Sequence, residues 1–457
     1  MAEDIRPAVT EPETGARHDP GTIIELQIDS LATGGEGVGR EANGRVVFVP
    51  RAAPGDLVRA RLVVSRKRWA RGEIVELLVP GPGRRQAPCP LYDRCGGCAI
   101  QHLEIETQRE SKRRIVSDTL HRIGGVNLDV PQLEPAGPEL GYRNRITVTL
   151  RRSTNGVRAG YRAKDDPDEV VDVADCILAE EPVRKALREL RAAWGSDACL
   201  LPGGDELRIT IRAGAGGDVA LWVQGGNADR PGEPESIERS ITGLASYVWT
   251  DSQGLRLNLA GSEHFRDSWQ GTWFALGPES FLQVNRGESV AMDRYLDQRV
   301  GPRNGLRIAD LYSGVGARAL RWAREGASVT AVESDAEACT TASLAAEESG
   351  LEVRVVCTPV EAALESFADS EVVIVNPPRA GLAESVAEAL VKAGPVRGLA
   401  YVSCDPATLA RDLARLSPAF EPVDARAFDA FPQTAHVETV VWLERNDGNL
   451  SPGTEML

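Results

Sequence analysis

The sequence lacks the features of membrane and exported proteins. Its 457 residues contain no run of about 18 consecutive apolar residues, so we expect no membrane-spanning helix and no membrane association. The first 20 residues lack the apolar core of a signal peptide and are interpreted as a disordered tail. No internal repeat is seen. These absences predict a cytoplasmic protein.

Cysteine is too scarce for a disulfide-stabilised fold, because only eight cysteines are distributed over the whole chain. In a reducing cytosol, cysteines that cluster indicate metal binding or catalysis instead. Hydrophobic residues make up 42% of the chain and charged residues 26%, which excludes a wholly disordered chain, a collagen and a coiled coil. The length predicts two to three domains.

Positive charge is also in deficit, since the net charge is −15, and this argues weakly against a nucleic-acid partner. Residues 21–86, however, hold 11 Lys or Arg against 7 acids, and residues 142–164 hold seven Lys or Arg and no acid. Basic segments in an acidic chain are compatible with an anionic polymer as the substrate. They are equally compatible with ordinary solvated surface.

Residues 21–79 contain four or five short β-branched runs separated by Gly, Asn, Asp and Pro, which predicts a small closed β-barrel of the OB type. A basic run around an aromatic residue, Trp69, lies near the end of this segment. The run comprises Arg66, Lys67, Arg68 and Arg71. Cations beside an aromatic ring suit contact with a nucleic-acid backbone and stacking on a base. The alternative is that Trp69 packs at the rim of the barrel.

Two further domains are expected after a Gly/Pro-rich joint at 81–90. Residues 103–125 predict a helix that ends at a Gly-Gly pair. From Tyr142 to about Val284, strand-like runs and one helix around 180–195 indicate an α+β domain. From about Gln283, strands and helices alternate, which predicts a doubly wound parallel sheet. The last residues, 446–457, are interpreted as a second disordered tail.

Three cysteines lie within ten residues, at Cys89, Cys95 and Cys98, with a Gly-Gly pair between the last two. A Cys-x-x-Cys turn lets two sulfur atoms converge on one metal centre, and the glycines relieve strain where the chain wraps closely. A fourth ligand is needed, and Cys176 is the nearest candidate in sequence. Zinc and an iron–sulfur cluster both accept four cysteines, so the spacing leaves the metal open.

Residues 308–317 predict a strand that runs into a glycine-bearing turn and a helix, with Gly314 in the turn. Glu333 ends the next strand, 19 residues later, where an acidic side chain can bind both hydroxyls of a ribose. NAD and S-adenosylmethionine both contain a ribose, so both fit this pattern. A turn without a ligand is the third possibility.

Three polar residues follow or precede buried strands of this predicted sheet. Asn376 begins a loop that two prolines hold at the carboxyl end of a strand, where ligands bind in open α/β sheets. Cys404 ends the next strand, before a Pro turn and a helix whose N-terminus can activate a thiol. Glu438 lies just before the apolar run TVVWL. The set indicates covalent catalysis with proton abstraction, although Cys404 as a core residue and Glu438 as a surface acid are the ordinary alternatives.

These motifs together resemble the RNA uracil-5-methyltransferases. The resemblance rests, in this order, on FLQVN (281–285), DLYSGVG (310–316), NPPRAG (376–381), YVSCDPATLARD (401–412) and HVE (436–438). Residues 89–101, with Cys176, are similar to the 4Fe-4S knot of the rRNA-modifying members, and the N-terminal barrel is similar to a TRAM domain. The resemblance spans roughly residues 21–444.

The resemblance implies a fold for each part of the chain. A TRAM/OB-like β-barrel is expected at 21–80, and an α+β central domain with the cysteine cluster at 81–282. Residues 283–445 are expected to form a doubly wound, Rossmann-like methyltransferase domain that uses S-adenosylmethionine. Residues 1–20 and 446–457 are the predicted tails.

The resemblance also implies residue roles, with Cys404 as the nucleophile and Glu438 as the base. The implied cofactor contacts are Gln283, Tyr312, Gly314, Glu333 and Asn376. The implied ligands of a 4Fe-4S cluster are Cys89, Cys95, Cys98 and Cys176. The basic segments add expected RNA contacts at Arg66, Lys67, Arg68, Arg71, Arg143 and Arg145.

Several positions depart from the family pattern, and most of them concern the cofactor site. Ser313 replaces a usual Cys, and Asn376 a usual Asp. Ala317 replaces a polar residue that often touches the methionine end of the cofactor, and Thr358-Pro359 replaces a contact to the adenine. Asp405 stands beside the nucleophile where Asn is usual.

The implied activity is methylation of carbon 5 of a uridine in RNA through a cysteine–uracil adduct. The cysteine cluster and the TRAM-like barrel favour rRNA, and 23S rRNA first, over tRNA. The alternatives are a tRNA uracil-5-methyltransferase, an RNA-binding iron–sulfur protein with weak or lost catalysis, and an NAD-dependent enzyme. Retention of both Cys404 and Glu438 argues against lost catalysis. No obligate protein partner is evident.

Overall fold

A computed structural model describes residues 18–154, 156–227 and 229–446. Most of the two predicted tails, residues 1–17 and 447–457, lies outside the described residues. No helix in the described ranges is long and apolar enough to cross a membrane. Contacts divide the chain into two compact units. The first comprises 1–88, 98–111 and 433–435, and the second comprises 89–97, 112–432 and 436–457.

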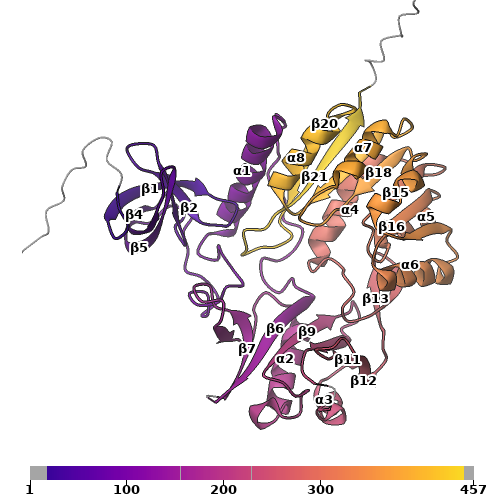
Figure 1. Cartoon of the computed structure of the whole chain (residues 1–457), viewed down its shortest axis with the longest axis horizontal. Helices are drawn as coiled ribbons and strands as arrows, with labels where there is room; N and C mark the ends of the chain where they lie inside the picture. Colours follow the sequence, from indigo (N-terminus) through magenta and orange to yellow (C-terminus); the bar gives the residue numbers. More distant parts are fainter. Residues whose placement is uncertain (1–17, 155, 228, 447–457) are drawn as a thin grey trace, which may run out of the picture. The chain divides into compact units, whose positions relative to one another are not determined.

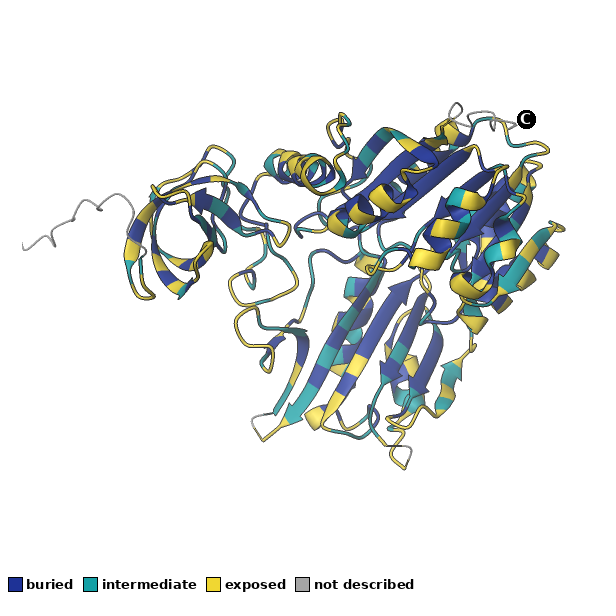
Figure 2. Cartoon of the chain, turned by 45° about the horizontal axis from the view of Figure 1, so that its top comes forward, coloured by how far each residue is buried: buried dark blue, intermediate teal, exposed yellow. Residues whose placement is uncertain are grey.

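The first unit contains a closed five-stranded barrel with the strand order β1-β2-β3-β5-β4 (Figure 1). Its strands are β1 (Ile23–Leu31), β2 (Gly37–Arg40), β3 (Val46–Val49), β4 (Leu57–Ser65) and β5 (Trp69–Val79). Buried and exposed residues alternate along its strands, as the colours of Figure 2 show, because successive residues of a strand face opposite sides. The interior is apolar, with Leu26, Val47 and Leu62 almost fully buried. The predicted small closed barrel is thereby confirmed.

The central part of the second unit is a seven-stranded sheet with the order β12-β11-β10-β9-β6-β7-β8. Its strands are β6 (Arg145–Ser153), β7 (Gly156–Arg162), β8 (Val170–Asp172), β9 (Glu206–Ala213), β10 (Val219–Gln224), β11 (Leu244–Thr250) and β12 (Arg256–Gly261). Helix α2 (Glu181–Ala193) packs its apolar face on this sheet through Val183, Leu187 and Leu190, as the predicted helix at 180–195 requires. A second short helix, α3 (Pro234–Ser240), joins the same core and was not expected.

The chain also contains a long helix and a separate hairpin. Helix α1 (Ile105–Gly124) corresponds to the predicted helix at 103–125; it starts in the first unit and continues in the second from Lys112. A hairpin of β13 (Phe265–Trp269) and β14 (Thr272–Leu276) precedes the segment that carries Gln283.

The last domain is a seven-stranded sheet with the order β17-β16-β15-β18-β19-β21-β20. The strands are β15 (Arg307–Leu311), β16 (Ser328–Glu333), β17 (Val353–Cys357), β18 (Val372–Val375), β19 (Gly398–Ser403), β20 (Phe420–Phe428) and β21 (Glu438–Arg445). The helices are α4 (Arg286–Val300), α5 (Ala317–Arg324), α6 (Ala336–Glu348), α7 (Glu384–Lys392) and α8 (Pro406–Leu416). Apolar cores cover the sheet on both faces, so β18 and β19 are buried along their whole length.

The sheet confirms the predicted doubly wound α/β class, with one difference at its edge. Strands β15 to β19 are parallel, but β21 runs antiparallel to both β19 and β20. The chain between β20 and β21 holds no crossover helix, and only a crossover returns a strand in the parallel direction. This reversal brings the start of β21 to the edge where the parallel strands end.

Candidate active site and cofactor pocket

The turn between β15 and α5 is shaped by backbone conformations that place its polar groups. Tyr312 has a φ of 60°, a left-handed value that costs a non-glycine residue about 1–3 kcal/mol. Gly316 also has a positive φ, and a Cβ there would meet the Cβ of Ala342 at 3.0 Å. Glycine is therefore needed for close packing of the turn on α6. The strained Tyr312 donates its hydroxyl to Glu361 at 3.3 Å.

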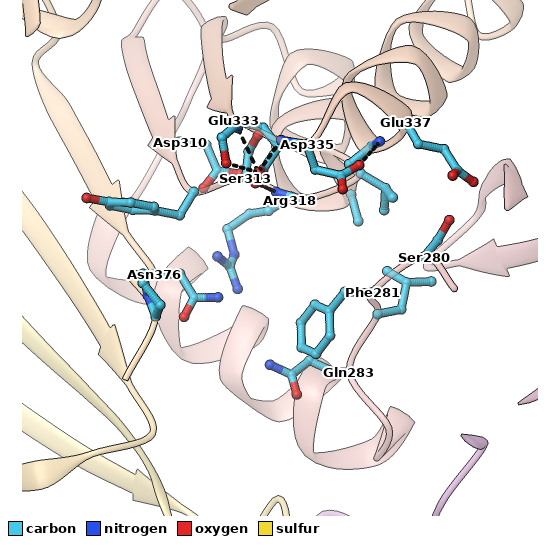
Figure 3. Close-up of a pocket in the computed structure, with 18 of the residues that line it drawn as sticks. Ser280, Phe281, Gln283, Asp310, Ser313, Arg318, Glu333, Asp335, Glu337 and Asn376 are labelled. Atoms are coloured by element: carbon cyan, nitrogen blue, oxygen red, sulfur yellow. Dashed lines mark hydrogen bonds between the residues drawn. The ribbon is translucent and has the colours of Figure 1, made fainter. Parts of the chain in front are cut away.

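Glu333 is held at the end of β16 by backbone N–H groups. Its Oε2 accepts from the N–H of Gly314 at 2.9 Å, and its Oε1 accepts from the N–H groups of Ser334 and Asp335 at 2.7 and 2.9 Å. The dashed lines in Figure 3 show this arrangement. The carboxylate is thus oriented before any ligand arrives.

A cavity of about 790 Å³ opens beside this turn. The five residues predicted to contact a cofactor all line it: Gln283, Tyr312, Gly314, Glu333 and Asn376. Figure 3 labels Gln283, Glu333 and Asn376. The five residues come from three places along the sheet edge and from the segment before α4. Contact of these five residues with a cofactor stays a prediction. Their position around one cavity is a feature of the structure.

The cavity carries buried polar groups that no described residue satisfies. Asp310 Oδ1 and Ser313 Oγ are both buried and have no hydrogen-bond partner. Burial raises the pKa of Asp310 to about 6, although the nearby Arg318 acts in the opposite direction. Buried polar groups without partners are rare, so these two atoms mark a place where a polar ligand fits.

Cys404 and Glu438 reach the same edge of the sheet because of the strand register. In the antiparallel pair of β19 and β21, Ser403 lies opposite Thr439, so the residue after β19 and the first residue of β21 are neighbours. Burial and the charge of Glu438 both raise the pKa of the Cys404 thiol. Burial also raises the pKa of Glu438, to about 7. Perturbed pKa values mark candidate functional groups, and the roles of Cys404 and Glu438 stay predictions.

Arg379 acts on both of these groups and was not predicted as a site residue. Its guanidinium lowers the pKa of both Cys404 and Glu438, against the effect of burial. Arg379 belongs to the NPPRAG loop, whose Asn376 and Pro378 line the cavity. One loop therefore connects the cavity with Cys404 and Glu438. The only sequence signal for Arg379 was its place in that motif.

Asp412 of α8 forms hydrogen bonds that hold this loop in place. Its Oδ2 accepts from the hydroxyl of Tyr401 at 2.7 Å and from the N–H of Leu382 at 2.8 Å, and its Oδ1 accepts from Arg411 and Arg415. Gly381 packs against it so closely that a Cβ would lie 2.3 Å from Asp412 Oδ2. The carboxylate thereby fixes the end of the loop that carries Arg379.

Three of the four cysteines proposed as metal ligands belong to the second unit, and two of them, Cys95 and Cys176, lie near Tyr161. The Tyr161 hydroxyl contacts the Cys176 sulfur at 3.9 Å. Burial raises the pKa of that hydroxyl, and Cys176 and Cys95 raise it further. Burial likewise raises the pKa of Cys89, and Cys176 adds to this effect. Cys98 belongs to the first unit. Among the described residues, no group of three or more His, Cys, Asp or Glu side chains is arranged to hold a metal ion.

The basic residues predicted to contact RNA have different surroundings. Arg66, Lys67 and Arg68 are exposed in the turn between β4 and β5, whereas Arg71 pairs with Glu36 at 2.8 Å. Trp69 beside them is 40% exposed and packs edge-on against Phe48, with ring centroids 6.3 Å apart.

Arg143 and Arg145 lie in the second unit. Arg143 lies over the ring of Phe431 at 5.8 Å and lowers the pKa of His436, two residues before Glu438. Arg145 donates to the carbonyls of Glu279 and Ser280, at 3.1 and 3.3 Å, in the segment that leads to Gln283. Arg143 is therefore near His436, and Arg145 supports the cavity wall.

Comparison with known proteins identifies the family. Residues 278–446 match the family model described as tRNA (Uracil-5-)-methyltransferase, and residues 17–75 match the TRAM domain. A 23S rRNA (uracil(1939)-C(5))-methyltransferase of Chromohalobacter salexigens is 34% identical over 452 residues, which cover 95% of this chain and 92% of that protein. The chain belongs to the RNA uracil-5-methyltransferase family.

Two further members of the RNA uracil-5-methyltransferase family are similar over nearly the whole chain. A 23S rRNA (uracil(1939)-C(5))-methyltransferase of Pseudomonas putida is 31% identical and covers 93% of this chain, with 94% of that protein aligned. The crystal structure of the Pyrococcus abyssi tRNA (uracil-54, C5)-methyltransferase, in complex with S-adenosyl-L-homocysteine, superposes with a TM-score of 0.72 at 26% identity. It covers 92% of this chain and 100% of its own.

The glycine turn is compatible with both NAD and S-adenosylmethionine. Membership of the RNA uracil-5-methyltransferase family distinguishes between these two cofactors. A methyltransferase needs a methyl donor, and S-adenosylmethionine is one whereas NAD is not. The NAD-dependent alternative is therefore wrong, and the cavity beside Glu333 is the candidate site for S-adenosylmethionine.

Proposed function

We propose that this RNA uracil-5-methyltransferase methylates carbon 5 of a uridine in 23S rRNA, through a covalent adduct between Cys404 and the uracil ring. The observation that carries the proposal is the register of β19 and β21, which brings Cys404 and Glu438 together at the sheet edge. The loop that starts at Asn376 extends from the cofactor cavity to this pair.

The cavity fits the cofactor by chemistry and by size. Glu333 is oriented to accept hydrogen bonds from the ribose hydroxyls, and Asp310 and Ser313 offer unsatisfied acceptors to a cationic group. Its volume of about 790 Å³ is in the range of small-molecule sites. When bound, S-adenosylmethionine supplies an electrophilic methyl group.

Cys404 starts the reaction because carbon 5 of uracil is a poor nucleophile. Its thiolate adds to carbon 6, and the electron pair of the C5–C6 bond moves to give an enolate that is nucleophilic at carbon 5. Arg379 lowers the pKa of the thiol and so favours the thiolate against the effect of burial. The uridine must leave its stack to reach a buried sulfur, so a flipped base or a single-stranded loop is required.

Glu438 completes the reaction after carbon 5 has accepted the methyl group. Its carboxylate takes the proton from carbon 5, and the released electron pair restores the C5–C6 bond while the Cys404 sulfur leaves as a thiolate. A carboxylate with a pKa of about 7 is a stronger base than an exposed one and is still ionised in part at neutral pH. The products are 5-methyluridine in the RNA, S-adenosylhomocysteine and the proton held by Glu438, and the Cys404 thiolate is regenerated.

The choice of rRNA rests on the two bacterial relatives named for 23S rRNA, while the tRNA enzyme of Pyrococcus abyssi supports tRNA as the second candidate. Mapping 5-methyluridine in rRNA and tRNA from cells with and without the gene tests this. Loss of a 23S rRNA site, restored by the intact gene and not by Cys404→Ala, supports the proposal. Loss confined to tRNA favours the second candidate, and unchanged RNA in both classes overturns both.

We also propose that Cys89, Cys95, Cys98 and Cys176 bind a 4Fe-4S cluster. Cys95 and Cys176 lie near Tyr161, and Cys176 acts electrostatically on Cys89, which fits a shared centre. Among the described residues these thiols are not arranged as a set of metal ligands. No step of the reaction is therefore assigned to the cluster.

Protein purified without air should contain about four irons per chain. The Cys89→Ser variant should lose iron, whereas Cys199→Ser, an exposed cysteine outside the cluster, should keep it. Stoichiometric zinc without iron would contradict the cluster.

A further inference from the structure

The cofactor cavity has a strongly unequal distribution of charge. Seven of the described residues that line it are Asp or Glu, whereas Arg318 is the only Lys, Arg or His among them. S-adenosylmethionine has an amino-acid end with a carboxylate and an ammonium group. In a site lined by carboxylates, an anionic group is stable only beside the single cation. The position of Arg318 therefore decides where a carboxylate can bind.

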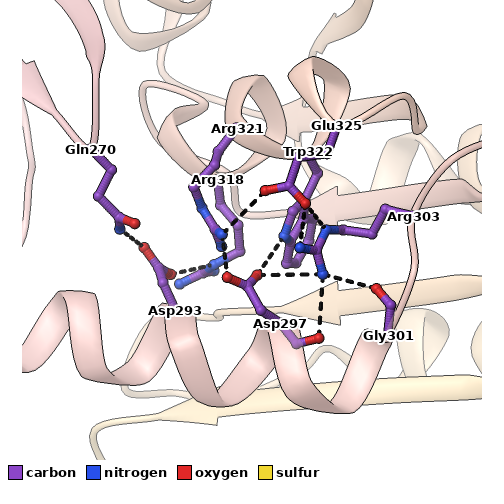
Figure 4. A network of polar contacts seen from close by, with 9 residues as sticks. All are labelled: Gln270, Asp293, Asp297, Gly301, Arg303, Arg318, Arg321, Trp322 and Glu325. Carbon is purple, nitrogen blue, oxygen red and sulfur yellow. Dashed lines mark hydrogen bonds and ion pairs between the residues drawn. The ribbon is translucent and has the colours of Figure 1, made fainter.

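One edge of the Arg318 guanidinium is hydrogen-bonded within the protein, and the other edge can bind a ligand. Its Nε donates to Asp293 Oδ1 at 3.0 Å, and Gln270 holds the second oxygen of Asp293 at 2.5 Å (Figure 4). Neither Nη group of Arg318 makes a hydrogen bond to a described residue. The side chain is only 15% exposed, and in Figure 3 the guanidinium projects into the cavity toward Asn376. The two free nitrogens thus form the fork that binds a carboxylate in the plane of the guanidinium.

The neighbours of Arg318 complete a site for a zwitterion. Asp310 interacts with Arg318 electrostatically and has a buried Oδ1 without a partner, and the buried Ser313 Oγ has none either. An ammonium group needs acceptors of this kind. The burial that raises the pKa of Asp310 would be offset by a bound cation, which favours the carboxylate form. A cation and an anion stand side by side, as the two charges of an amino acid do.

We propose that Arg318 binds the carboxylate of the cofactor's amino-acid end, with Asp310 and Ser313 receiving its ammonium group. This inference rests on the proposed use of S-adenosylmethionine and assigns the orientation of that molecule in the cavity. It also accounts for Ala317, which has no polar side chain to offer at this end of the cofactor. Arg318 is then a specificity-determining residue for amino-acid-bearing nucleosides.

A structural role for Arg318 is the competing explanation, because α4 and α5 are joined by similar pairs nearby. Arg321 donates to Asp297 at 2.5 Å, and Trp322 donates to the other oxygen of Asp297 at 3.0 Å (Figure 4). Those residues do not line the cavity, whereas Arg318 does. A structural role predicts that loss of Arg318 affects every ligand equally, and carboxylate binding predicts that it does not.

The test compares two ligands by isothermal titration calorimetry. One is S-adenosylhomocysteine, and the other is its analogue with hydrogen in place of the carboxylate. The intact protein should bind S-adenosylhomocysteine at least about tenfold more tightly, against the general attraction of an acidic cavity for the more cationic analogue. The Arg318→Gln variant should lose this preference while its affinity for the analogue is kept or increased. Arg318→Lys should restore part of the preference, because one charge remains without the fork.

The matched control is Arg324→Gln, on the same helix and with the same change of charge. Arg324 donates to Thr272 and does not line the cavity, so both affinities should stay unchanged. Equal affinity of the intact protein for the two ligands overturns the proposal, whether or not any variant folds. An equal loss for both ligands in Arg318→Gln overturns it as well. Binding of neither ligand by the intact protein contradicts the proposed cofactor itself, which is a different outcome.

Discussion

In the proposed mechanism Cys404 and Glu438 act at different times, and their variants should therefore fail differently. Cys404→Ala should give neither a covalent RNA adduct nor methyl transfer, because the nucleophile is absent. Glu438→Gln should accumulate a methylated, covalently bound RNA–protein complex, because addition and transfer precede proton removal. Denaturing gel electrophoresis with labelled RNA separates the two results. Normal turnover by Glu438→Gln would assign the base role to another group.

The pH dependence of the reaction should reveal the buried carboxylate. Glu438 must be ionised to accept a proton, and its pKa of about 7 means that the rate rises with pH across neutrality. Burial raises the pKa of the Cys404 thiol, so a second rise is expected at higher pH as the thiolate forms. Arg379 lowers the pKa of both Glu438 and Cys404, so Arg379→Gln should move the inflection to higher pH. Single-turnover rates between about pH 6 and pH 9 measure it. A flat profile, or a shift to lower pH, is incompatible with this assignment.

Among the structural elements, the loop between β18 and α7 should be sensitive to a small change. Gly381→Ala introduces a Cβ against Asp412 at a φ of 78°, so it should lower the free energy of unfolding by roughly 1–3 kcal/mol. Because Asp412 also holds Leu382, the change should displace Arg379 and reduce the rate more than the fold. Thermal unfolding and single-turnover kinetics measure the two effects.

Gly394→Ala is the control for that loop, since it follows the next helix and has open space around its Cα. It should leave both the melting temperature and the rate nearly unchanged. A rate loss in Gly381→Ala no greater than expected from its lower stability would mean that the loop does not position Arg379.

The sequence predicted most elements of this fold because their hydrophobic periods are regular. The barrel strands alternate, and β18 and β19 are continuous apolar runs that only a sheet covered on both faces can bury. The direction of β21 could not be predicted, since an apolar run reads the same whether the strand is parallel or antiparallel. The neighbouring positions of Cys404 and Glu438 depend on that direction.

Side-chain contacts were harder to predict from the sequence than helices and strands were. Arg143 and Arg145 are two residues apart and equally basic in sequence, yet one lies over Phe431 and the other supports the cavity wall. Arg318 and Arg379 gave no signal of their own, because the charges they face come from other elements. Such contacts depend on tertiary packing that no local pattern encodes.

At the scale of the whole molecule, an acidic chain must bind a polyanion through local positive charge. Replacing Arg66, Lys67 and Arg68 with Gln should weaken RNA binding and reduce the log–log salt slope by roughly 0.7–0.9 per lost phosphate contact. Arg59→Gln is the control in the same barrel, because its charge is already paired with Glu25 and Glu76. Filter binding at several salt concentrations measures the slopes. An unchanged slope in the triple variant would mean that these residues are ordinary solvated surface.

The carboxylates around the cofactor cavity also influence how the enzyme finishes a cycle. Methyl transfer converts a sulfonium cation into a neutral sulfide, so the bound nucleoside loses one positive charge while the seven lining Asp and Glu residues stay in place. The same electrostatic field therefore holds the donor more strongly than the spent product. Competitive titration should show weaker binding of S-adenosylhomocysteine than of S-adenosylmethionine, with a difference that narrows as salt is added. The acidic wall thus favours exchange of product for fresh donor and limits product inhibition.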